Sequence, residues 1–144
     1  YIGEAARAYG IRMGGRAVNI EEEYGSLLPA AKLADKKPCG RLLSTAHFHV
    51  DLYGYFIPPG CTGIRIPLAE AVRGIPQGKY RAFEALYEGG PARLFELALS
   101  LGFAENPRGY ASRCGLCFHL RHFLCGHSFP ELPREHYEES LKYY

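Results

Sequence analysis

The cysteines constrain the fold of this chain more than any other feature of its sequence. Five occur in 144 residues, and two of them form a C-x-x-C motif at residues 114–117. Two residues between the cysteines let a tight turn direct both sulfurs at one metal centre, and Gly115 relieves crowding where the backbone wraps that centre. The motif therefore predicts a fold organised around a metal or redox site.

A predicted β-hairpin supplies the second pair of candidate ligands. The extended runs AHFHVD and YFIPP are joined by D-L-Y-G, which fits a type I turn followed by a left-handed glycine. Because a hairpin brings its two ends together, Cys39 before it and Cys61 after it are expected to be neighbours. We call the four candidate ligands the four-cysteine set: Cys39, Cys61, Cys114 and Cys117. Four thiolates suit either zinc or an iron–sulfur cluster.

Other interpretations of the cysteines remain open at this point. Cys114 and Cys117 could form a thioredoxin-like redox pair, because C-G-L-C also opens a predicted helix. The preceding residues, RGYASR, are polar, whereas that interpretation requires a buried strand. Cys125 lies eight residues after Cys117, about 12 Å further along a continuous helix. We therefore expect Cys125 to belong to the core.

Composition excludes several classes of partner and indicates a compartment. The formal net charge of +2 gives no reason to expect a nucleic-acid partner, and no apolar run reaches the length of a membrane span. An odd number of cysteines without a signal peptide favours metal or redox use in a reducing, cytoplasmic compartment. The chain begins at Tyr1 and its only methionine is Met13, which indicates a fragment with a catalytic part upstream.

The expected fold class is α+β, with a small β-hairpin and several helices around a metal cluster. Residues 1–36 are predicted as helix, strand (RAVNI) and a helix interrupted at Pro29, forming the tail of an upstream α/β, barrel-like domain. We place a boundary near Lys37, so that residues 37–144 form the cluster-binding domain. After a loop and a short helix following Pro67, the predicted helices are KYRAFEALYEGG, PARLFELALSLG, LCFHLRHFL and a last one from Pro133 that includes Tyr137, Leu141 and Tyr144.

From about Pro38 to Tyr137, these residues resemble a known family. The pattern is Cys39, fourteen residues, Gly54, six residues, Cys61, a long gap and then C-G-L-C. It resembles the auxiliary-cluster domains, of the SPASM or twitch type, that follow the catalytic barrel of radical S-adenosylmethionine enzymes. The stretches that carry the resemblance are HFHVDLYGYFIPPGC, LYEGGPARLFELA and GYASRCGLCFHLRHFL.

The resemblance implies one auxiliary [4Fe–4S] cluster held by the four-cysteine set. A full SPASM domain carries seven cysteines and two clusters, so the five cysteines here fit the shorter twitch form. The C-x-x-x-C-x-x-C triad that binds the catalytic cluster is absent, and S-adenosylmethionine would bind only to a missing N-terminal barrel, the implied partner. The chain alone is then not catalytically competent, and its substrate is unknown. The alternative is a structural Cys₄ zinc module that mediates binding.

Other polar residues are weaker candidates. His47, His49 and Asp51 share one face of a predicted strand, a row that can bind zinc or iron. No third ligand outside the hairpin is evident, so we expect a polar face near the cluster. Arg121 lies one helical turn beyond Cys117, where a cation can stabilise an anionic cluster, but we favour ordinary solvent exposure for this residue.

Overall fold

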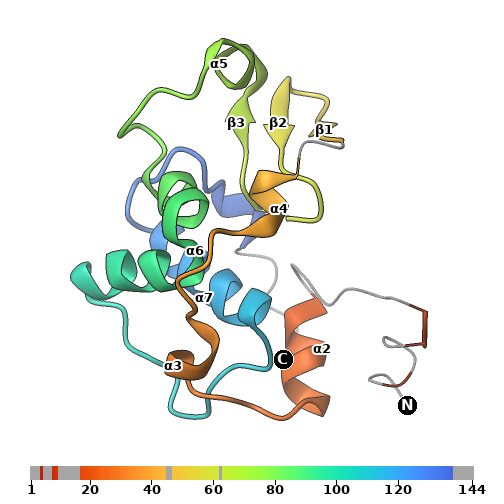
Figure 1. Cartoon of the computed structure of the whole chain (residues 1–144), viewed down its shortest axis with the longest axis vertical. Coiled ribbons are helices and arrows are strands. Elements are labelled where there is room, and N and C mark those ends of the chain that lie inside the picture. The colour runs from red at the N-terminus through yellow and green to blue at the C-terminus, as the bar shows by residue number, and fades with distance from the viewer. Residues whose placement is uncertain (1–3, 5–7, 10–16, 45–46, 62, 138–144) are drawn as a thin grey trace.

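The structure is a computed structural model that describes residues 4, 8–9, 17–44, 47–61 and 63–137. The described chain mixes short helices with one small antiparallel sheet, which agrees with the predicted α+β class. In Figure 1 the sheet lies at one end of the long axis and the first helices lie at the other. Two longer helices fill the middle of the molecule, and the predicted site lies among them.

The predicted hairpin is confirmed. Strand β1 (His49–Val50) pairs antiparallel with β2 (Tyr55–Ile57), with Val50 opposite Phe56. The Asp51 carboxylate accepts the N–H groups of Tyr53 and Tyr55, both at 2.9 Å, and Gly54 has a φ of 78°. Aspartate and glycine therefore close this turn as their types predicted.

A third strand was not predicted. Strand β3 (Ile66–Pro67) pairs antiparallel with β2 and gives the order β1-β2-β3, where we expected a loop. Two residues are too few to show the alternation that marks a strand in sequence. The short helix predicted after Pro67 is confirmed as α5 (Leu68–Arg73).

The prediction of a strand for RAVNI is wrong. Residues from Val18 onward form the helix α2 (Val18–Tyr24), and the Val18 side chain is buried. Tertiary packing against α7 overrides the β propensity of Val18 and Ile20. The interruption predicted at Pro29 is confirmed, because α2 ends at Tyr24 and Pro29 caps a separate short helix, α3 (Ala30–Leu33).

The two helices predicted on either side of the Gly-Gly-Pro sequence are confirmed, and they meet at a kink. Helix α6 (Arg81–Ser100) continues through Gly90, whose φ of 64° and ψ of −155° are not helical. Pro91 follows, and proline cannot donate the backbone hydrogen bond that would continue the first half. Helix α7 (Arg113–Cys125) covers the third predicted helix. Helices α6 and α7 pack against each other and form the centre of the fold (Figure 1).

The last predicted helix can be compared with the structure only up to Tyr137. Among the described residues after Pro133, the chain forms a 3₁₀ turn, η2 (Arg134–His136), and Tyr137 ends it fully buried. Leu141 and Tyr144, and residues 5–7 of the first predicted helix (EAARAY, residues 4–9), lie outside the described residues. A further short helix that was not predicted, α4 (Gly40–Leu43), precedes the hairpin. None of the helices in the described ranges is long and apolar enough to cross a bilayer.

Candidate metal centre

All members of the four-cysteine set line one small cavity. They come from three separate stretches of the chain, which meet where α4, the turn after β2 and the two central helices converge. The cavity has a volume of about 60 Å³, well below the roughly 300–1,000 Å³ of typical pockets for organic ligands. The remaining lining residues are Arg41, Gly60, Leu86, Pro91, Arg113 and Arg121.

Cys39 is fixed by backbone hydrogen bonds on both sides. Its N–H donates to the Leu86 carbonyl of α6 at 3.0 Å, and its own carbonyl accepts from Leu42 at 2.9 Å as the N-cap of α4. The sequence places Cys39 at a cap because the preceding Pro38 disfavours helix and Gly40 begins one. Cys39 therefore lies against the middle of α6 rather than simply at the entrance to the hairpin.

Cys61 is held by a β-turn. The Cys61 N–H donates to the Pro58 carbonyl at 3.2 Å, and Gly60 has a φ of 63°. Proline at the second position and a left-handed glycine at the third are the residues that a type II turn requires. The sequence Pro-Pro-Gly-Cys therefore places the thiol at the end of a rigid corner directly after β2.

Cys114 and Cys117 lie in the first turn and a half of α7. Ser112 caps this helix, and its hydroxyl accepts the Gly115 N–H at 3.0 Å. Cys114 is exposed, whereas Cys117 is buried against α6. The C-x-x-C motif therefore presents one thiol on the surface side of the cavity and one on its inner side.

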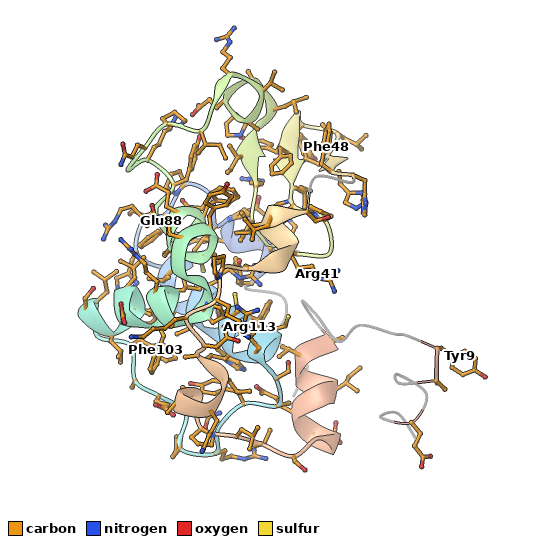
Figure 2. All side chains as sticks on the ribbon, viewed as in Figure 1. Tyr9, Arg41, Phe48, Glu88, Phe103 and Arg113 are labelled. Carbon is orange, nitrogen blue, oxygen red and sulfur yellow. The ribbon has the colours of Figure 1, made fainter. Side chains whose placement is uncertain are left out.

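Arginine side chains join the thiols around the cavity. Arg113 donates to the Lys37 carbonyl at 2.6 Å and pairs with Asp35 at 2.8 Å, which fastens the segment before Cys39 to the start of α7. Arg41 and Arg113 both carry labels near the middle of the molecule in Figure 2. Arg121 is 4% exposed, so its guanidinium is the most deeply buried cation of the described chain. The expectation that Arg121 is an ordinary solvated residue is wrong.

Arg121 also links the cavity to the C-terminal segment. It donates to the Cys117 carbonyl at 3.3 Å and to the Tyr137 hydroxyl at 3.1 Å. The Tyr137 hydroxyl in turn donates to the Gly63 carbonyl, two residues after Cys61. A Cβ on Gly63 would lie 2.6 Å from that hydroxyl, so glycine is needed for this approach. These contacts connect Cys117 with the segment that follows Cys61.

Burial and the nearby Arg121 shift the pKa values of the Cys61 and Cys117 thiols in opposite directions. Burial raises the pKa of Cys117 to about 12, while the Arg121 guanidinium acts in the opposite direction. Burial likewise raises the pKa of Cys61, again against the effect of Arg121. Burial works against the charge of Arg121, but the facing Tyr137, Cys61 and Cys117 groups raise its pKa well above its usual range. Both thiols therefore stay protonated near neutrality unless a metal displaces the protons, and Arg121 stays charged.

The donor set consists of four thiols that line one cavity. Within the part of the chain that the structure describes, no group of three or more His, Cys, Asp or Glu residues is arranged to hold one metal ion. In a four-iron cluster each thiolate binds a different iron, so ligands spaced around a volume are what such a cluster needs.

The histidine row does not form a site. His47 and His49 are exposed and their rings meet edge to face with centroids 5.5 Å apart. Asp51 uses its carboxylate to close the turn.

The prediction that Cys125 belongs to the core is confirmed: it packs against the core, and its thiol donates to the His122 carbonyl at 2.9 Å. The sequence interpretation missed Arg113 and Tyr137; for Arg113, a basic residue beside a C-x-x-C was the available signal.

Comparisons with known proteins add no family. No protein-family model matches the chain, and no match was found among the curated proteins or the solved structures.

Proposed function

We propose that the four-cysteine set binds an auxiliary [4Fe–4S] cluster and that the chain is the C-terminal, cluster-binding part of a radical S-adenosylmethionine enzyme. The observation that carries the cluster is the gathering of four thiols from three stretches around one small cavity. The enzyme class rests on the resemblance of the hairpin, the Gly-Gly-Pro stretch and the C-G-L-C stretch. S-adenosylmethionine belongs to an upstream barrel domain under this proposal.

When bound, such a cluster supplies a one-electron redox centre. The residues of this chain hold and insulate it. Cys39 and Cys61 would ligate from the rigid cap and turn, and Cys114 and Cys117 from the start of α7. Leu86 and Pro91 keep water from the α6 side of the cavity. Because four thiolates complete the ligation, an electron-transfer or structural role is favoured over direct binding of substrate.

Arg121 provides the electrostatic part of the proposal. A bound cluster with four thiolates is anionic, and burying an anion is costly unless a cation or hydrogen-bond donors face it. Arg121 lines the same cavity and is buried one helical turn beyond Cys117 on α7. Its charge would therefore stabilise the ligated form and, more strongly, the reduced form, which carries one more negative charge.

Metal and sulfide analysis of anaerobically purified protein tests this function. We expect about four irons and four sulfides per chain and a brown colour. Cys39→Ser and Cys61→Ser should lose the iron, whereas Cys125→Ser should retain it as the matched control. One zinc without sulfide would support the structural zinc module instead. A protein that binds no metal, and whose thiol exchange survives Cys39→Ser, would support the redox pair of Cys114 and Cys117.

A further inference from the structure

A second and larger cavity lies beside α4, away from the cysteines. Its volume is about 680 Å³, within the roughly 300–1,000 Å³ of pockets for small organic ligands. It is bounded by α4, the sheet, α5 with the loop after it, and the first half of α6. The residues that line it are Leu42, Phe48, Phe56, Leu68, Ala71, Val72, Ile75, Gln77, Phe83, Glu84, Tyr87 and Glu88.

The walls of this cavity are aromatic and aliphatic. Phe83 and Tyr87 of α6 are stacked, with ring centroids 6.1 Å apart and planes 13° from parallel. The ring of Phe48, just before β1, lies 5.8 Å from the ring of Phe56 on β2. Phe48 is 57% exposed and Val72 is 76% exposed, so apolar surface is open to a ligand. Large apolar side chains gathered at one exposed place mark a binding surface.

The charged side chains that line this cavity are acidic. Among the described residues, the charged side chains that line it are Glu84 and Glu88, both on α6. Glu84 accepts the Gly78 N–H at 2.6 Å, which fixes it against the loop after α5. Glu88 pairs with Arg93 at 3.2 Å, and both of these side chains are more than half exposed, so the pair can exchange at little cost. Figure 2 labels Glu88 on α6 and Phe48 just before β1, and both line this cavity.

We infer that this cavity binds a small organic cation with an apolar, ring-bearing body and an ammonium group. The aromatic walls receive the body, and the ammonium lies at Glu88 beside the ring of Tyr87, in place of Arg93. A carboxylate and the face of a tyrosine ring both attract a cation. This site is separate from the cysteine cavity and does not depend on the proposed cluster.

Three probes of equal length separate charge from hydrophobicity. Calorimetry on the purified protein would compare 4-phenylbutylammonium with 4-phenylbutanol and 4-phenylbutanoate. We expect the ammonium to bind roughly threefold to tenfold more tightly than the alcohol, and the carboxylate most weakly. Glu88→Gln should remove the preference for the ammonium, and Phe48→Ala should weaken the ammonium and the alcohol alike. Glu96→Gln is the control, because Glu96 is exposed on α6 and lies outside the cavity lining.

Several outcomes would overturn this inference. Equal binding of the three probes would remove the role of Glu88, and binding that survives Phe48→Ala unchanged would place the probe elsewhere. The molar mass of the protein in solution could rise with its concentration and fall back to that of one chain in Val72→Glu. That result would show that a second copy covers the cavity. None of these results depends on whether iron is bound.

Discussion

The kink of α6 provides the sharpest test of how the fold positions the cysteines. Gly90 has a φ of 64°, and a Cβ added there would lie 1.9 Å from the carbonyl oxygen of Lys37. The same carbonyl accepts the hydrogen bond from Arg113 and lies two residues before Cys39. Gly90→Ala should therefore move the segment that carries Cys39 away from the cavity.

The loss of folding stability expected for Gly90→Ala has two parts. An alanine held in this glycine conformation costs about 1–3 kcal/mol, and forcing the Lys37 carbonyl aside costs about 1–3 kcal/mol more. Gly90→Ala should therefore lower the free energy of unfolding by roughly 2–6 kcal/mol. Gly102→Ala isolates the first part, because Gly102 has a φ of 93° with nothing within 4 Å of its added Cβ. Its expected loss is about 1–3 kcal/mol.

The assay is urea unfolding followed by circular dichroism, with every variant in the same metal state. Iron content of the folded fraction is the second measurement, and it should fall in Gly90→Ala but not in Gly102→Ala. Gly40→Ala is a control beside Cys39 itself, since its added Cβ meets nothing within 4 Å. Equal stability losses and equal iron contents in Gly90→Ala and Gly102→Ala would refute the reasoning.

Three further predictions concern the buried charges and the spare thiol. Arg121→Gln should lower the reduction potential of the bound cluster by about 60 mV or more, which is a tenfold change in the equilibrium constant for one-electron reduction. In the same redox titration, Arg41→Gln should lower the potential by less. Glu131 is fully buried and accepts the N–H groups of Ala82 and Phe83 at the start of α6, so Glu131→Ala should cost about 2–4 kcal/mol in urea unfolding, with Glu131→Gln costing less. Burial raises the pKa of Glu131 above 4.5, so the folded protein binds this proton more tightly than the unfolded chain does. The resulting stabilisation is fully present below pH 4.5 and is lost as the pH rises through the raised pKa. Glu131→Gln should therefore flatten the dependence of the unfolding free energy on pH. Cys125→Ser should leave iron content unchanged while costing about 1 kcal/mol or less, and loss of iron would make Cys125 a ligand.

Local signals in the sequence predicted those parts of the fold that local chemistry decides. The turn at Asp51 and Gly54 and the break at Pro29 need only one or two residues in a stated role, and the structure has both. Val18 and Ile20 favoured a strand locally, but packing of Val18 into the core made them helical. The Gly-Gly-Pro sequence marked the break between the two predicted helices at Gly90, but no pattern near Gly90 reveals its close approach to the carbonyl of Lys37, 53 residues away in the sequence.

The sequence predicted which residues line the candidate site, but not the contacts that bring them together. Spacing and glycine context identified the four-cysteine set, and these residues do line one cavity. The expected reason was that hairpin ends meet, yet the strands are only two and three residues long and α4 separates β1 from Cys39. Cys39 is instead placed by its hydrogen bond to Leu86, a long-range contact that sequence spacing does not encode.

The hydrogen bonds that position the cysteines argue for a site arranged by the protein itself. Cys39 is fixed by Leu86, Cys61 by its turn to Pro58, and the start of α7 by Ser112. Under the proposed function, the buried Arg121 would face ligands whose backbone positions these hydrogen bonds already hold. Such anchoring would limit the change in geometry between the oxidation states of a bound cluster, as electron transfer requires.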